Sequence, residues 1–164
     1  MLIRPPLWKA TSRGDRFMQK EVRRIAFAVT AYSSKHQMAS ELVFTCHSVA
    51  LAFSLMFPNL KLANGVLIGI KWVKRAGKVR SQLTYCEHSW LVTSSGAIID
   101  AYPVGLMTID PILVVSKGNH KYYGGTSYYQ DETIKFCISR AEIRKKAYAL
   151  LRVMRKAEKY VQSI

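Results

Sequence analysis

One stretch, Cys86 to Asp100, constrains the fold more than any other part of the chain. Apolar and β-branched residues stand on both sides of the turn-forming cluster Ser94-Ser95-Gly96. Two such runs, separated by a short cluster that contains glycine, are typical of a β-hairpin. Because both arms also carry apolar side chains on each face, the pattern predicts central strands that are covered on both sides.

The length of the turn decides which side chains meet. We consider a three-residue loop that ends with Gly96 in the left-handed conformation. Its register places Trp90 opposite Asp100. His88 then faces Tyr102, and its ring lies diagonally beside the Asp100 carboxylate, within reach. A two-residue loop would put His88 and Asp100 on opposite faces, so the turn length tests whether the pair exists.

An imidazole held by a carboxylate needs a nucleophile or a metal to act on. Upstream, Thr45-Cys46-His47-Ser48 opens an apolar run from Val49 to Phe57. Thr45 can cap a helix there, which places Cys46 in the first turn, where the helix dipole favours thiolate over thiol. If one helix instead continues from Met38 to Phe44, Cys46 lies in mid-helix and loses that help.

These residues resemble the transglutaminase-like branch of the papain-type thiol enzymes. The resemblance covers roughly residues 40–103 and rests on the helix Cys46 to Phe57, the step His88-Ser89-Trp90, and the segment Ile98 to Pro103. It implies an α+β fold of the papain-like or transglutaminase-like kind, with the nucleophile helix packed on an antiparallel β-sheet. The resemblance extends to small cysteine peptidases that remove leader peptides from ribosomally made peptides.

The resemblance implies a thiol hydrolase or acyltransferase that acts on an amide bond of a peptide or protein, as a peptidase, deamidase or transglutaminase-type enzyme. The implied catalytic residues are Cys46 as the nucleophile, His88 as the base and Asp100 as the residue that orients the base. The implied binding residues are Trp90, which would shield the histidine–aspartate contact, Tyr102, and Gln37. Papain-type enzymes place a glutamine a few residues before the cysteine, whereas Gln37 stands nine residues before Cys46. We expect no cofactor.

A metal site is the chemical alternative. Zinc could take two thiols and two imidazoles from Cys46, His47, Cys86 and His88. However, His47 directly follows Cys46 on the predicted helix and is expected to point elsewhere, and Cys86-x-His88 is an uncommon spacing for ligands. We therefore predict a thiol site and no metal.

The helices predicted at the two ends complete a single domain. From about Asp15, apolar residues recur at three- and four-residue steps, which predicts an amphipathic helix. The sequence Ser139-Arg140-Ala141-Glu142 is a capping box that opens a C-terminal amphipathic helix. We expect a basic irregular arm over residues 1–14 and one α+β domain over residues 15–164.

Further strands are predicted around the central hairpin. The runs 66–73 and 79–85 flank a turn at Arg75-Ala76-Gly77, so that a four-stranded antiparallel meander is the economical topology. Ile112 to Val115 predicts another short strand. The Gly- and Tyr-rich segment Asn119 to Tyr129 is consistent with an edge strand or with a lid over the site.

The charge points to partners rather than to a fold. The chain has 25 Lys and Arg residues against 10 Asp and Glu, a net charge of +15, with clusters in residues 1–24, from Lys71 to Arg80, and from Arg140 onward. Such an excess attracts an acidic protein, a nucleic acid or an anionic surface. Two other classes therefore stay open: a basic nucleic-acid or anionic-surface binding module, and a catalytically inactive member of the fold that serves in protein interaction.

Cysteine usage and hydropathy suggest the compartment. Cys46, Cys86 and Cys137 are an odd set without CxxC spacing, so a disulfide framework is not expected. No apolar run reaches the roughly 18 residues of a membrane span, and the first residues lack the pattern of a secretory signal. We expect a cytoplasmic protein with no transmembrane segment, whose main partner is a peptide or protein substrate.

Overall fold

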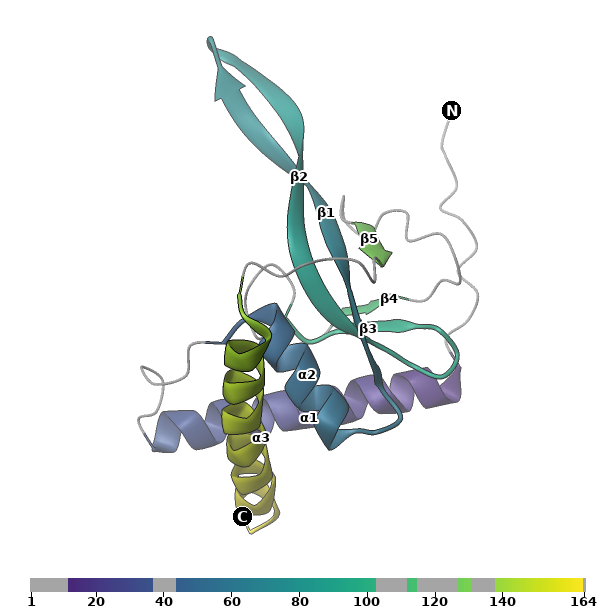
Figure 1. Cartoon of the computed structure of the whole chain (residues 1–164), viewed down its shortest axis with the longest axis vertical. Coiled ribbons are helices and arrows are strands. Elements are labelled where there is room, and N and C mark those ends of the chain that lie inside the picture. The colour runs from purple at the N-terminus through teal and green to yellow at the C-terminus, as the bar shows by residue number, and fades with distance from the viewer. Residues whose placement is uncertain (1–11, 37–43, 103–111, 115–126, 131–137, 164) are drawn as a thin grey trace.

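The chain forms an α+β arrangement in which helices cover an antiparallel sheet (Figure 1). The computed structural model describes residues 12–36, 44–102, 112–114, 127–130 and 138–163. Within them lie three helices and five strands, in the order α1 (Arg13–Lys35), α2 (Cys46–Met56), β1 (Lys61–Arg75), β2 (Lys78–Val92), β3 (Ile98–Asp100), β4 (Ile112–Val114), β5 (Ser127–Gln130) and α3 (Arg140–Gln162). The sheet order is β4-β3-β2-β1-β5, and every neighbouring pair is antiparallel. The predicted α+β class, with the cysteine helix against an antiparallel sheet, is confirmed at this level.

Helix α1 begins earlier than the apolar pattern indicated. The Ser12 hydroxyl accepts a hydrogen bond from the backbone N–H of Asp15, and the Asp15 carboxylate accepts one from the N–H of Ser12. This reciprocal cap starts the helix at Arg13 rather than at about Asp15. The end of the predicted irregular arm is therefore wrong, because the capping pair lies before the first apolar residue of the stripe. Residues 1–11 of that arm lie outside the described residues.

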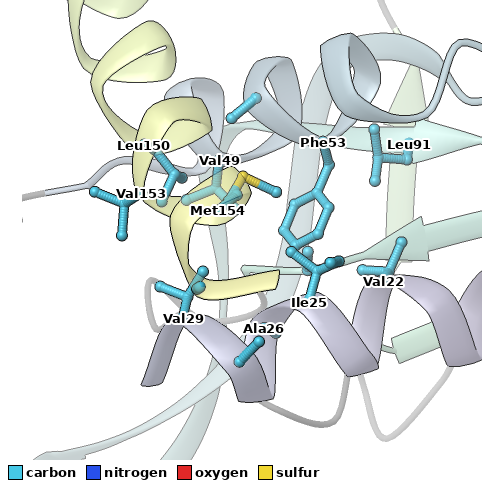
Figure 2. Packing of buried hydrophobic residues seen from close by; sticks show 14 of the residues in the cluster. Val22, Ile25, Ala26, Val29, Val49, Phe53, Leu91, Leu150, Val153 and Met154 are labelled. Carbon is cyan, nitrogen blue, oxygen red and sulfur yellow. The ribbon is translucent and has the colours of Figure 1, made fainter. Parts of the chain in front are cut away.

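The main core lies between the three helices and one face of the sheet. Val22 and Ile25 of α1 and Leu150 and Met154 of α3 are fully buried, which confirms both amphipathic stripes. Figure 2 shows Phe53 pointing from α2 toward Ile25 on α1. Leu91 of β2 and Ile99 of β3 belong to the same cluster, so the helices cover the face of the sheet that carries these two residues.

The predicted four-stranded meander is wrong at its second and third strands. The run expected at 79–85 and the first arm of the Cys86–Asp100 hairpin form one continuous strand, β2, which pairs with β1 from Arg75↔Lys78 to Lys61↔Val92. Residues 78–92 contain no Gly, Pro or Asn, so nothing in the sequence ends the strand near Cys86. The tip is a two-residue turn in which Ala76 and Gly77 have φ of 48° and 75°, as a type I′ turn requires. The distal part of this ribbon projects well beyond the rest of the molecule (Figure 1).

The three-residue turn that the site requires is confirmed. The N–H of Thr93 donates to the carbonyl of Ala97 at 2.9 Å, and Gly96 has a φ of 85°. The paired residues Leu91↔Ile99 and Val92↔Ile98 set a register that, continued by one step, places Trp90 opposite Asp100. All three residues of β3 are buried, as expected of a central strand.

The outer strands, β4 and β5, test two further predictions. The strand expected at Ile112 to Val115 is present as β4 over Ile112–Val114, beside β3. Within the Gly- and Tyr-rich segment, Ser127–Gln130 forms the edge strand β5 against β1, so the edge-strand interpretation holds there. Residues 119–126 of that segment lie outside the described residues. None of the three described helices combines the length and apolar composition that a membrane span needs.

Candidate active site

His88 and Asp100 form a buried pair on one face of the sheet. Nε2 of His88 lies 2.7 Å from Oδ2 of Asp100, and the two side chains are 2% and 0% exposed. The other carboxylate oxygen, Oδ1, accepts a hydrogen bond from the backbone N–H of Tyr102 at 2.9 Å. Trp90 stacks beside the imidazole, with 6.2 Å between ring centroids and 26° between planes. Because Nε2 is engaged by Asp100, the ring presents Nδ1 to its other neighbours.

Cys46 is the first residue of α2. Thr45 is extended, with φ of −123° and ψ of 160°, and its hydroxyl accepts a hydrogen bond from the N–H of Ser48. The helix therefore starts at Cys46, and the alternative in which the cysteine lies in mid-helix is wrong. Its sulfur lies 3.9 Å from the carbonyl oxygen of Glu87, the residue before His88. The nucleophile candidate thus stands beside the histidine at a helix N-terminus.

The electrostatic environment shifts the pKa values of the thiol and the imidazole in opposite directions. Burial raises the pKa of Cys46, but hydrogen bonds with His47 and His88 outweigh it and lower the pKa to about 6. Burial lowers the pKa of His88, while hydrogen bonds with Asp100 and Cys46 raise it to about 9. A thiolate and an imidazolium stabilise each other in this way when they are neighbours. With the pKa of Cys46 near 6 and that of His88 near 9, the ion pair is favoured over the neutral thiol and imidazole at neutral pH.

Cys46 and His88 approach each other from opposite faces of the sheet. Alternate residues of β2 face opposite sides, so His88 and Trp90 point away from the helix-covered side on which Leu91 lies. Helix α2 packs on that helix-covered side. Since β3 pairs with β2 only at Leu91 and Val92, the backbone of β2 at Glu87 lies beyond that paired stretch. The Cys46 sulfur reaches the carbonyl of Glu87 at this point and so comes within reach of the ring on the far face.

The prediction that His47 points away from Cys46 is wrong. His47 is buried, and its Nδ1 lies 2.7 Å from the Ser89 hydroxyl, which donates to Oδ1 of Asn64 at 2.7 Å. Because the single hydroxyl proton goes to Asn64, Nδ1 of His47 is the donor toward Ser89. His47 also hydrogen-bonds with Cys46. Sequence reasoning missed this chain, since the pairing Asn64↔Ser89 is visible only once the register of the long hairpin is known.

Of the three predicted binding residues, Tyr102 and Trp90 lie beside the candidate site. The Tyr102 hydroxyl donates to the carbonyl of Phe44 at 3.0 Å, so it ties the end of β3 to the segment that leads into Cys46. Burial and the charge of Cys46 raise the pKa of Tyr102, which places it in the field of the sulfur. Trp90 is 1% exposed and shields the histidine–aspartate contact. Gln37 lies outside the described residues.

The four proposed zinc ligands are not grouped as a metal site. Among the described residues, no three His, Cys, Asp or Glu side chains are placed so that they could hold a metal ion. Cys86 is exposed, and burial of its sulfur together with the charge of Cys46 raises its pKa. The second thiol is therefore in an environment that disfavours the thiolate a metal would bind.

A cysteine at a helix start, beside an imidazole that a carboxylate holds from behind, is an arrangement suited to nucleophilic acyl transfer. Comparison of the chain with protein-family models, with curated proteins and with solved structures found no match.

Proposed function

We propose that the protein is a thiol hydrolase or acyltransferase that acts on an amide bond of a peptide or protein, with Cys46, His88 and Asp100 as its catalytic triad. The observation that carries the proposal is the convergence of the Cys46 sulfur and the His88 ring, with Asp100 bound to the far nitrogen of that ring at 2.7 Å. The residues that resemble the transglutaminase-like branch of the papain-type enzymes are the ones that converge. We propose that the fold belongs to that group.

The reaction has two halves. The Cys46 thiolate attacks the carbonyl carbon, and the tetrahedral intermediate collapses when the His88 imidazolium donates its proton to the leaving amine. A thioester to Cys46 and a neutral His88 remain. His88 then takes a proton from water or from an acceptor amine, whose attack on the thioester releases the acyl group and restores the thiolate. Asp100 stabilises the imidazolium in both halves.

The oxyanion of each intermediate needs hydrogen-bond donors. The backbone N–H of Cys46 is the proposed donor, because the first N–H groups of a helix have no partner within the helix. The N–H of Ser48 is already used by the Thr45 hydroxyl at 3.2 Å. A thiol of low pKa works only while it is reduced, which suits the reducing conditions of the cytoplasm.

Selective alkylation tests the activated thiol. At pH 7 a cysteine with a pKa near 6 is mostly thiolate, so we expect iodoacetamide to modify Cys46 about tenfold faster than Cys137 or Cys86. Peptide mapping by mass spectrometry gives the three rates in one experiment. Equal rates for Cys46 and Cys137 would mean that no activated thiolate exists.

Turnover tests the reaction itself. Peptides that contain glutamine, with and without an added amine, are incubated with the wild type, and mass spectrometry separates peptide hydrolysis, deamidation and amine incorporation. Cys46→Ala should abolish whichever reaction occurs, and the matched variant Cys86→Ala should retain it, since Cys86 is not part of the triad. Activity that survives in Cys46→Ala would contradict the proposal.

A further inference from the structure

A line of polar side chains leads along β2 from the tip of the ribbon to His88. Lys78, Arg80, Gln82, Cys86 and His88 are separated by even numbers of residues on this strand and therefore lie on one face. The first four are exposed, whereas His88 is buried. We call Lys78, Arg80 and Gln82 the basic track.

The opposite face of the same strand is of a different kind. Val79 and Tyr85 lie there and are 64% and 65% exposed. Lys78 and Arg80 therefore share the side of β2 that carries His88, while Lys74 of β1, the partner of Val79, is exposed on the other side. The side of β2 that carries Lys78 and Arg80 is thus the side that leads to the candidate active site.

The charge around the track is of one sign. Five Lys and Arg residues lie between Lys71 and Arg80, and the sequence contains no acidic residue from 68 to 86. The tip of the ribbon stands clear of the described helices (Figure 1). Exposed cations in a stretch of sequence without acidic residues attract an anionic partner.

The distance along the strand limits what such a partner can be. At about 3.3 Å per residue, Arg80 lies about 26 Å and Lys78 about 33 Å from His88. This is too far for contact with groups next to the reacting bond. An extended peptide that runs beside β2 covers the same distance in a similar number of residues.

We propose that the basic track binds an acidic segment of the peptide or protein substrate, about eight to ten residues away from the amide bond at Cys46. The inference rests on the proposed thiol chemistry, because it takes the substrate to be a peptide chain. A peptide is favoured over a nucleic acid since the cations share a strand and a face with His88. A peptide that lies along this side of β2 can contact the cations with one segment while its reacting amide bond reaches the Cys46 sulfur.

Binding is measured on Cys46→Ala protein, which holds the substrate without turning it over. Fluorescent peptides carry a block of Asp and Glu about nine residues from a central glutamine, the same block as Asn and Gln, or the acidic block next to the glutamine. The first peptide should bind best. The double variant Lys78→Glu with Arg80→Glu should weaken its binding about tenfold, because each change replaces an attraction by a repulsion.

The matched control reverses the same charges elsewhere. Arg152→Glu with Lys156→Glu alters two exposed cations of α3 by the same amount and should leave the affinity within about twofold. Equal losses in both double variants would reduce the effect to the net charge of the molecule and overturn the proposal. Binding that is indifferent to the position of the acidic block would overturn it too.

The same variants separate this inference from the proposed function. In an otherwise wild-type chain, the track variant should keep the iodoacetamide rate of Cys46, because the track does not touch the sulfur. If that rate is normal and acidic peptides still bind equally well, the track proposal fails while the thiol site stands. If duplex DNA binds more tightly than the acidic peptide and the track variant abolishes that binding, the ribbon is a nucleic-acid contact and the proposal is wrong.

Discussion

Two imidazoles approach the Cys46 sulfur, and each has a different hydrogen-bond partner on its other side. His88 is backed by the Asp100 carboxylate, whereas His47 is backed by the hydroxyl of Ser89. A carboxylate stabilises a positive ring, while a hydroxyl that already donates elsewhere only fixes the orientation of the ring. The proton taken from the thiol is therefore expected on His88. His47 serves to hold the first turn of α2 against β1 and β2.

The pH dependence of alkylation tests this assignment at the level of single residues. In the wild type the rate should rise through about pH 6, where Cys46 loses its proton, and amide turnover should fall again above about pH 9, where His88 loses its own. Asp100→Asn removes the charge that raises the pKa of His88, so the imidazolium is lost more easily and the pKa of Cys46 rises toward 9. The midpoint of alkylation should move to higher pH by on the order of one unit.

Asp15→Asn is the control for that measurement. Asp15 is also a buried carboxylate, but it accepts its hydrogen bonds from Ser12 and Ser95, at the start of α1 and in the turn before β3. An asparagine amide can still hydrogen-bond with Ser12 and Ser95, so the turn should stay in place and the alkylation midpoint should not change. A midpoint that stays near pH 6 in Asp100→Asn would show that Asp100 does not act through His88.

At the scale of elements, the β2–β3 turn sets which residues share a face. Gly96 adopts a φ of 85°, and its N–H donates to the carbonyl of Thr93 at 2.9 Å. The Ser95 hydroxyl donates to Asp15 at 2.6 Å, so the start of α1 holds this turn. A slip of one residue here would move His88 and Asp100 to opposite faces. The turn is thus a structural requirement of the candidate active site.

Replacing each of the two turn glycines measures how much each turn contributes to the free energy of unfolding. Gly96→Ala forces a side chain into the left-handed region and should lower the free energy of unfolding by about 1 kcal/mol. Gly77→Ala faces the same strain, with φ of 75°, but lies at the free tip of the ribbon. The tip can open without the core, so its global effect should stay below about 0.5 kcal/mol. Urea unfolding followed by tryptophan fluorescence gives both values, and equal losses would contradict this difference.

At the scale of the whole molecule, one shared core joins the helices to the sheet. Phe53 of α2 lies in the same buried cluster as Ile25 of α1, Met154 of α3 and Leu91 of β2. The position of Cys46 relative to β2 depends on this packing, because α2 packs against α3 and against the strands β1 and β2. Loss of the core should therefore disturb the candidate site even though none of the proposed catalytic residues changes.

Phe53→Ala tests that dependence. Removing a ring that is 1% exposed should lower the free energy of unfolding by about 3–5 kcal/mol. The alkylation rate of Cys46 should fall as well, as α2 loosens from the sheet. Phe27→Ala, at a ring that is 56% exposed, should change stability by less than about 0.5 kcal/mol. A normal alkylation rate in a destabilised Phe53→Ala protein would show that the core does not position the sulfur.

Local patterns were sufficient for much of this architecture. The cap at Thr45, the stripe on α3 and the turn that ends at Gly96 depend on neighbours within a few residues, so the sequence predicted them. The strand break expected near Cys86 failed, because pairing with β1 along its whole length decides how far β2 continues. The position of Gln37 relative to the site stays a prediction.

The sequence by itself determined which residues could share a face: the spacing of His88, the three-residue turn and Asp100 fix their contact through backbone geometry alone. Only the tertiary structure decided that the Cys46 sulfur meets that pair, and that His47 lies between Ser89 and the same sulfur. Cys46 and His88 are separated by the whole β1–β2 ribbon, and α2 lies on the opposite side of the sheet from the ring. Such a meeting depends on how the helices pack over the sheet, and packing is a property of the whole core rather than of any short segment.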